Sequence, residues 1–352
     1  MKIAQIAPLY EAVPPKLYGG TERIVSYLTE ALVDLGHDVT LFASGDSRTR
    51  AMLAPMRDQS IRMDPAPLKS DLAAHLAMLH EVSRRSGEFD LLHFHVDLLQ
   101  FPVFAHIAHK TLTTLHGRLD LKDLAAAYGC WPAFPLVSIS DDQRRPLPSA
   151  NWLGTVHHGI PVDQCALSTH PRGGYLAFLG RISPEKRPDR AIAIAKAAGL
   201  PLKMAAKVDQ ADAAYFRDVV EPLLDDPSIE FIGEISDGDK SEFLGGAIAL
   251  LFPIDWPEPF GLVMIEALAC GTPVIAWNRG SVPEIIEDGV TGRVVESLEQ
   301  AVAAVAEVSG YDRRRIRQCF ERRFSAHAMA LSYDALYRCL HSLGNIETRR
   351  LA

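Results

Sequence analysis

Short, continuous runs of apolar residues alternate with helix-like segments along most of the 352-residue chain. Runs that are apolar throughout, rather than at every second position, predict strands buried on both faces, which is typical of parallel sheets. The expected strands are residues 2–8, 38–44, 91–96, 111–116, 136–140 and 155–160 in the first half, and 175–180, 202–208, 229–235, 249–254, 273–277 and 292–296 in the second.

Helical segments lie between these runs. Residues 21–35 and 187–198 carry apolar side chains at helical spacing, and each segment is followed by a glycine, Gly36 or Gly199, that is typical of a helix end. This alternation of strand and helix predicts an α/β fold with right-handed crossovers.

The length exceeds that of one ordinary domain and suits two. The rhythm of strand and helix breaks at residues 163–174, which are rich in Ser, Thr, Pro and Gly, so we expect a linker there. We predict two doubly wound, Rossmann-like domains facing a central cleft, with ligands at the carboxyl ends of the strands. The predicted domains are residues 1–165 and 172–325, and a C-terminal helix at 326–352 is expected to cross back to the first domain.

Composition excludes several classes of protein. A net charge of -8 makes phosphate-driven nucleic-acid binding a poor hypothesis. The five cysteines are odd in number and none is in CxxC spacing, which favours reduced thiols. No apolar run approaches the roughly 18–20 residues of a transmembrane helix, and the apolar N-terminal stretch is too short for a signal peptide. We therefore expect a soluble cytoplasmic protein without a transmembrane segment.

The strongest pattern is Glu-Pro-Phe-Gly-Leu-Val-Met-Ile-Glu-Ala-Leu-Ala-Cys-Gly-Thr-Pro at residues 258–273. It follows the expected strand 249–254 and becomes a helix from Leu262 onward. Glu258 lies in the loop before this helix and Glu266 about one turn inside it. A helix N-terminus attracts anions, and the two carboxylates could accept hydrogen bonds from sugar hydroxyls. The structural alternative is a strand–helix turn with solvated acids.

Two further patterns follow expected strands. In Leu-Gly-Arg-Ile-Ser-Pro-Glu-Lys-Arg-Pro at residues 179–188, Arg181 and Lys186 could close on one anion, although surface ion pairs are the alternative. In Pro-Pro-Lys-Leu-Tyr-Gly-Gly-Thr-Glu at residues 14–22, two glycines allow a ligand to approach the backbone, or form a plain turn. The latter is not GxGxxG, so the nicotinamide fingerprint is absent.

Together, these patterns resemble the family 4 glycosyltransferases, which are retaining enzymes of the GT-B fold. The resemblance rests on Phe-Gly-Leu after the first glutamate and on Glu-Ala-Leu-Ala-Cys-Gly-Thr-Pro-Val from the second. It implies that Glu258 holds the donor sugar and Glu266 the nucleotide ribose. It also implies that the donor sugar-diphosphate site is lined by Phe260, Gly261 and Leu262, partly through backbone amides.

The resemblance extends to the other two patterns. It implies that Arg181 and Lys186 bind the donor diphosphate and neutralise the leaving group. It places Gly19 and Gly20 opposite the donor phosphates and the acceptor. It also implies that the strand ending near Ile235 contacts the nucleobase through backbone groups.

Histidines give weaker signals. His116 ends an expected strand, where the resemblance implies a contact with the donor sugar near the reaction centre. His93, His95 and Asp97 share one strand face by their period of two. A metal site would need further ligands, which do not follow at suitable spacing, so core packing or a cleft-lining role for His95 are the alternatives. His158 replaces the Asn that is usual in the family's interdomain turn, which leaves that role open.

Asp237-Gly238-Asp239 resembles the DxD of metal-dependent glycosyltransferases, but this DxD belongs to another fold class, and here the segment more readily starts a helix. We therefore predict no metal site.

The resemblance implies a retaining, metal-independent hexosyltransferase that moves a sugar from a nucleoside-diphosphate sugar, most commonly a UDP-sugar, to a hydroxyl acceptor. The sugar nucleotide is a co-substrate, and no other cofactor is expected. Glu258, His116, Arg181 and Lys186 form the expected catalytic group, with Glu258 not assigned as a covalent nucleophile. A sugar-nucleotide epimerase of the same fold and a non-catalytic sugar-nucleotide-binding protein are the alternatives. A lipid acceptor would bring the protein into peripheral contact with a membrane.

Overall fold

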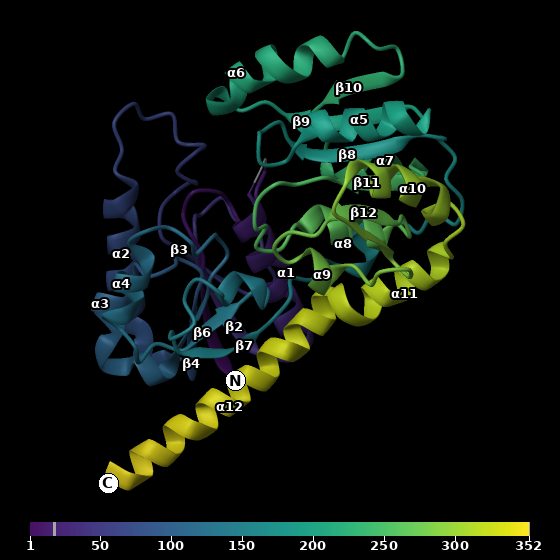
Figure 1. Cartoon of the computed structure of the whole chain (residues 1–352). Helices are drawn as coiled ribbons and strands as arrows, with labels where there is room; N and C mark the ends of the chain where they lie inside the picture. Colours follow the sequence, from purple (N-terminus) through teal and green to yellow (C-terminus); the bar gives the residue numbers. More distant parts are fainter. Residues whose placement is uncertain (17–18, 352) are drawn as a thin grey trace. The chain divides into compact units, whose positions relative to one another are not determined.

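The computed structural model describes residues 1–16 and 19–351, and the side chains of these residues up to 342 (Figure 1). Leu17 and Tyr18 of the Gly-Gly pattern lie outside the described residues. The chain divides into two compact units. Unit 1 contains Met1–Gly159 and Ala326–Ala352, and unit 2 contains Ile160–Ser325.

Unit 1 is built on a seven-stranded sheet with the order β3-β2-β1-β4-β5-β6-β7. All of its strand pairs are parallel. The strands are β1 (Lys2–Ile6), β2 (Asp38–Ala43), β3 (Met52–Pro55), β4 (Leu91–Phe94), β5 (Thr111–Thr114), β6 (Leu136–Ser138) and β7 (Trp152–Thr155). The helices are α1 (Gly20–Asp34), α2 (Asp71–Arg85), α3 (Phe101–Phe104), α4 (Leu124–Gly129) and the long C-terminal α12 (Ala326–Leu351).

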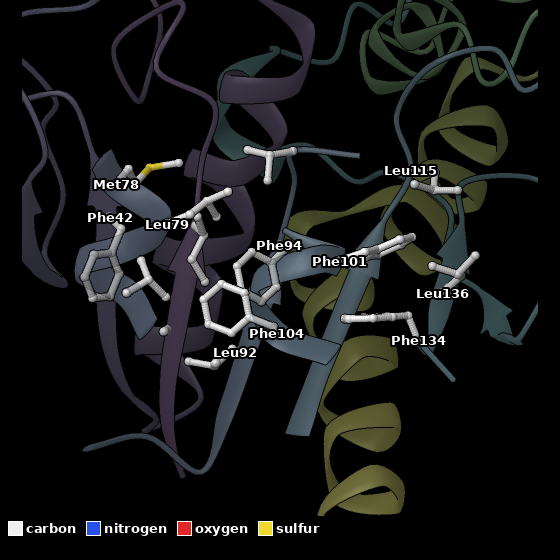
Figure 2. Close-up of a cluster of buried hydrophobic side chains, with 14 of the residues drawn as sticks. Phe42, Met78, Leu79, Leu92, Phe94, Phe101, Phe104, Leu115, Phe134 and Leu136 are labelled. Carbon is white, nitrogen blue, oxygen red and sulfur yellow. The ribbon is translucent and has the colours of Figure 1, made fainter. Parts of the chain in front are cut away.

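An aromatic cluster forms the main core of unit 1 (Figure 2). Phe94 at the end of β4 meets Phe104 of α3 with ring centroids 4.9 Å apart, and Phe101 stacks on Phe134 at 4.2 Å. Phe94, Phe101 and Phe104 are fully buried. Because large buried aromatic side chains contribute strongly to core stability, this cluster fixes the place where the chain leaves β4.

Unit 2 contains a six-stranded parallel sheet with the order β10-β9-β8-β11-β12-β13. Its strands are β8 (Leu176–Arg181), β9 (Leu202–Lys207), β10 (Ile229–Gly233), β11 (Ala249–Phe252), β12 (Val274–Trp277) and β13 (Gly292–Val295). Its helices are α5 (Pro188–Ala198), α6 (Ala213–Tyr215), α7 (Asp237–Gly246), α8 (Leu262–Ala269), α9 (Val282–Ile285), α10 (Leu298–Val308) and α11 (Arg313–Phe324).

Both units therefore have the strand order of a Rossmann fold, which confirms the predicted α/β class. In such sheets the chain adds strands first toward one edge and then, after one crossover, toward the other edge. Ligands bind outside the carboxyl ends of the two strands that flank this switch point. The flanking strands are β1 and β4 in unit 1, and β8 and β11 in unit 2.

Two expected features of the first half need correction. The last strand of unit 1 occupies Trp152–Thr155 rather than residues 155–160, and β3 was not predicted. Both strands are only partly buried and lie at the two edges of the sheet, so their sequences lack a continuous apolar run.

The boundary between the units also differs from the expected linker. It falls at Ile160, and residues 163–174 belong to unit 2. The backbone N–H of Ser168 donates to the carbonyl of Cys270 at 3.0 Å, and that of Gly173 donates to the carbonyl of Gly246 at 2.9 Å. The Pro- and Gly-rich composition of this segment therefore belongs to a loop that is bound to unit 2. The helix α12 is part of unit 1.

No helix among the described residues combines the length and the apolar character that a membrane span requires.

Candidate active site

The first candidate site lies in unit 2, at the carboxyl ends of β8 and β11. These strands are hydrogen-bonded neighbours, so the loops that follow them emerge side by side. The backbone N–H of Asp255 in one loop donates to the carbonyl of Glu185 in the other at 2.9 Å. The two strongest sequence patterns are thus brought together by the strand order.

Lys186 and Glu258 form an ion pair across these loops. The indole N–H of Trp256 donates to the same carboxylate oxygen at 3.0 Å. The ammonium of Lys186 also lies 5.0 Å from the ring centroid of Trp256 and 5.6 Å from that of Phe252. The Lys186 side chain is 17% exposed. An ammonium has three donors, and an anionic ligand can take those that Glu258 does not use.

The helix α8 begins next to this pair. Its N-cap, Gly261, has φ +82°, and no side chain caps the helix. Gly261 and Leu262 are partly exposed, so the first amides of the helix are available to an anion. Phe260 is buried, so its side chain does not line the site.

The loop after β12 supports Glu258, a contact that the sequence analysis missed. The backbone N–H of Ser281 donates to the carbonyl of Glu258 at 2.9 Å, and the Ser281 hydroxyl donates to the carbonyl of Phe260 at 2.8 Å. Gly280 has φ +56°, and a Cβ atom there would lie 2.3 Å from the Glu258 backbone nitrogen. Only glycine fits at this position, so Gly280 determines where the Glu258 loop lies.

We expect Gly280→Ala to lower kcat/KM by about 100-fold, because a displacement of a catalytic loop by about 1 Å has effects of this size. The matched control is Gly289→Ala. Gly289 also has a positive φ, of +77°, but a Cβ atom at this position would meet no other atom within 4 Å. The control should show only the left-handed strain of about 1–2 kcal/mol in thermal unfolding. Equal loss of activity in both variants would contradict the role of Gly280.

Arg181 ends β8 and is 31% exposed. Its guanidinium nitrogens lie 3.6 Å from a carboxylate oxygen of Asp209, 3.7 Å from Asp212 and 3.9 Å from Glu185. These ion pairs are long, and exposed pairs of this kind are weak. Arg181 is therefore held near the carboxyl end of the sheet by contacts that a diphosphate could replace.

Glu266 points inward from α8 and is 2% exposed. The ammonium of Lys240, on α7, donates to its carboxylate at 2.9 Å and also lies 3.0 Å from Asp237. Lys240 was not found from the sequence, because it comes 26 residues before Glu266 and matches no local pattern. The pair places a carboxylate of fixed orientation within α8.

The segment after β10 forms a capped helix start. Ile235 is partly exposed, and Ser236 caps α7 in a capping box with Asp239. The hydroxyl of Ser236 donates to the Asp239 carboxylate at 2.6 Å. The prediction that residues 237–239 start a helix is confirmed, and Asp239 is engaged in capping. No cluster of three metal-ligating side chains occurs in the part of the chain that the structure describes.

A second candidate site is a cavity of about 730 Å³ in unit 1, at the carboxyl ends of β1 and β4. Gly19, Gly20 and His116 line this cavity, together with His95 and Asp97. The structure thus brings together residues that the sequence analysis predicted from separate patterns.

A buried chain of hydrogen bonds fixes His116. His95 Nε2 lies 2.8 Å from Gln5 Oε1, and His95 Nδ1 lies 2.9 Å from His116 Nε2. Because an amide oxygen only accepts, His95 must donate through Nε2 and accept through Nδ1. His116 then donates through Nε2, which leaves its Nδ1 as an acceptor. That buried atom has no hydrogen-bond partner in the described part of the chain.

The histidines around this chain of hydrogen bonds are uncharged at neutral pH. Burial lowers the pKa of His116 to about 3 and holds the pKa of His95 well below its usual range. His93 lies beside them, 4.2 Å from His95 between ring centroids, so the two share one side of the strand as predicted. His158 stacks on His116 with centroids 5.3 Å apart and an interplanar angle of 18°.

Asp97 lies after the end of β4 and has φ +54°, so it leaves the strand face that it was expected to share with His93 and His95. Its side chain is exposed to the cavity, yet the surrounding protein raises its pKa by desolvation. Aspartate tolerates the left-handed region better than most residues, but a position there still stores strain that is common at functional sites.

Comparison with known proteins gives the class. The family model described as "Glycosyl transferases group 1" matches residues 168–315, within unit 2, and "Glycosyltransferase Family 4" matches residues 18–158, within unit 1. The curated relatives include D-inositol 3-phosphate glycosyltransferase of Mycobacterium marinum, 26% identical over 77% of this chain and 67% of that protein. The corresponding protein of Mycobacterium sp. strain KMS is 28% identical over 66% of this chain and 62% of its own length. The chain thus spans about two thirds of these relatives.

Solved structures share the fold over nearly the whole chain. The glycosyltransferase AviGT4, involved in avilamycin A biosynthesis, has a TM-score of 0.72 at 23% identity, covering 97% of this chain and 98% of that one. The Anabaena protein HepE, in complex with UDP and glucose, has a TM-score of 0.70 at 18% identity, covering 95% and 98%.

The fold and the two family matches define a GT-B glycosyltransferase, a class that transfers a sugar from a nucleotide sugar. Within this class, the chain belongs to glycosyltransferase family 4.

Proposed function

We propose that the protein is a retaining, metal-independent glycosyltransferase that transfers a hexose from a UDP-sugar to a hydroxyl group of an acceptor. The observation that carries the proposal is the Lys186–Glu258 pair between the β8 and β11 loops, next to the uncapped start of α8. Cations and free amides that converge at one point suit a diphosphate, and a carboxylate beside them suits a sugar hydroxyl. The complex of HepE with UDP and glucose supports this choice of donor.

In this mechanism, the residues of unit 2 act mainly on the leaving group. Arg181, Lys186 and the amides at Leu262 stabilise the negative charge that develops on the diphosphate as the glycosidic bond breaks. Glu258 orients the sugar. Glu266, held by Lys240, binds the ribose.

The residues of unit 1 act on the acceptor and on the sugar. The cavity lined by Gly19, Gly20 and His116 receives the acceptor. His116 lines this cavity as an uncharged imidazole and contacts the sugar. Since the leaving diphosphate takes the acceptor proton and attack occurs on the same face, no covalent intermediate on Glu258 is required.

The two glutamates provide the sharpest test of the donor site. The ribose is remote from the breaking bond, so its contact is similar in the ground and transition states. Glu266→Gln should therefore raise KM for the donor and weaken binding of UDP. The sugar becomes oxocarbenium-like, so Glu258→Gln should lower kcat. It should not weaken UDP binding, because it removes a carboxylate that competes with the diphosphate for Lys186. Calorimetric titration of UDP and steady-state kinetics on both variants measure these effects, and the opposite pattern would show that the roles are reversed.

Activity should persist in the presence of a chelator, because Arg181 and Lys186 supply the positive charge that a metal ion would otherwise provide. The measurement is sugar transfer with and without EDTA. A complete loss that manganese restores would refute metal independence. Donor turnover with and without acceptor, analysed for the product, also distinguishes transfer from epimerisation and from binding alone.

A further inference from the structure

The cavity of unit 1 has apolar walls. Its lining includes Leu98, Leu119 and Tyr128, and Leu72 and Leu121 extend this apolar surface toward solvent, where they are 56% and 55% exposed. Exposed leucines next to a cavity of about 730 Å³ are typical of a binding site for a ligand with an apolar part.

The cations that line the cavity are already engaged by carboxylates. Arg62 donates to the Glu11 carboxylate at 2.9 Å, and Arg118 donates to Asp120 at 2.7 Å. Phosphate recognition usually relies on a guanidinium or ammonium that can turn its donors to the ligand. Here, a neighbouring carboxylate neutralises each guanidinium, so a phosphate would have to compete with Glu11 or Asp120 for its donors.

The carboxylates that line the cavity are Glu22, Asp71 and Asp97. Asp71 accepts a hydrogen bond from the Tyr10 hydroxyl at 3.2 Å, and Glu22 is 5% exposed. Among the described residues, no ion pair or side-chain hydrogen bond occupies the Asp97 carboxylate, which is exposed to the cavity. Asp97 is therefore the carboxylate that a bound molecule would meet without displacing a protein partner.

We propose that this cavity selects an uncharged, hydroxyl-bearing acceptor with an apolar body, such as an alkyl or aryl glycoside, and that Asp97 makes the site reject phosphorylated acceptors. The inference rests on the proposed function, since it assigns the acceptor class of the same enzyme. A carboxylate accepts hydrogen bonds from hydroxyl groups but repels a phosphate, and the repulsion is strengthened where water is partly excluded. The chain would then differ in its acceptor from the relatives that are named for inositol 3-phosphate.

The test compares two matched probes, 4-nitrophenyl β-D-glucopyranoside and its 6-phosphate, by calorimetric titration into the 352-residue chain. We expect the neutral probe to bind at least about 10-fold more tightly than the 6-phosphate, because only the phosphate makes an unfavourable charge contact with Asp97. Asp97→Asn should weaken binding of the neutral probe and reduce this preference to about 2-fold. The control Asp123→Asn removes an exposed carboxylate between the lining residues Leu121 and Leu124, and should retain the preference.

Equal or tighter binding of the phosphorylated probe, or no binding of the neutral probe at millimolar concentration, would overturn the proposal. The proposal is also overturned if Asp97→Asn and Asp123→Asn show the same preference between the two probes while thermal unfolding shows that both variants are folded. A parallel titration with UDP tests the donor site of unit 2. Loss of UDP binding would count against the proposed function, whereas the probe preference reports on the cavity of unit 1 alone.

Discussion

Lys186→Met is expected to lower kcat/KM by about 100-fold or more. One charged hydrogen bond contributes roughly 1.5–3 kcal/mol, which alone corresponds to about 10- to 150-fold in rate. The structure adds a second effect, because Lys186 is also the ionic partner of Glu258, which is 8% exposed. Methionine keeps the length of the side chain and its packing against Trp256, so the loss is mainly that of the charge.

The comparison with Lys196→Met shows whether this effect is specific. Lys196 is also in unit 2 and pairs with Asp226 at 3.0 Å, but its side chain is 48% exposed. Its replacement should leave kcat/KM unchanged, since exposed pairs contribute little. Wild-type activity in Lys186→Met would refute the assignment of Lys186 to the donor diphosphate.

Stability measurements then separate the two roles of Lys186. We expect the single variant to lose about 1–3 kcal/mol of unfolding free energy, because Glu258 is left without its cation. Adding Glu258→Gln should recover part of this loss, whereas activity should remain low. Strictly additive changes in stability would mean that the two residues do not interact in solution.

The convergence of the two loops to which we assign the donor was predictable from the sequence. Arg181 and Lys186 belong to one continuous segment, and Glu258 and Glu266 belong to another. Each segment comes directly after a buried strand, and the strand order of a doubly wound sheet brings such loops together. The contacts that support these residues were not predictable. Gly280 and Lys240 reach Glu258 and Glu266 from other elements, and neither position has a local pattern that indicates a role.

Unit 1 was harder to predict for a different reason. The side chains that line its cavity come one at a time after separate strands, and tertiary packing decides which of them contact one another. His95, for example, is oriented by Gln5 of β1, which is 90 positions away in the chain. Asp97 was expected on a strand face, but its left-handed backbone turns it away from that face into the cavity. The edge strands β3 and β7 were missed or misplaced because they are only partly buried.

Mild acid is expected to destabilise unit 1 by about 4–8 kcal/mol between pH 7.5 and about pH 5. The main cause is the cluster of His93, His95, His116 and His158, and His37 and His75 of the same unit add to it because burial also lowers their pKa values. Burial holds the pKa of His93, His95 and His158 well below the usual range and lowers that of His116 to about 3. In the unfolded chain, each of these imidazoles titrates near pH 6.5.

The direction of the effect follows from proton binding. Below about pH 6.5, the unfolded chain binds protons that the folded cluster does not. The contribution of the uncharged histidines to the free energy of unfolding is therefore fully present above that pH and decreases as the pH falls toward 3. Each histidine contributes at most about 1.4 kcal/mol per pH unit. Burial raises the pKa of Glu22 and Asp97, so protonation of these carboxyls in the folded state offsets part of the loss.

Unit 2 serves as an internal control for this prediction, since it contains only His170 of the 13 histidines in the chain. Hydrogen–deuterium exchange at several pH values, corrected for the intrinsic exchange rate, should show acid-induced opening in β1, β4 and β5 but much less in β8 and β11. His158→Asn should reduce the pH dependence of the opening free energy of unit 1 by about one proton, or 1.4 kcal/mol per pH unit. Replacing the exposed His80 by glutamine should not change this dependence. If both units open to the same extent in acid, or if His158→Asn leaves the slope unchanged, then the histidine cluster is not what makes unit 1 sensitive to acid.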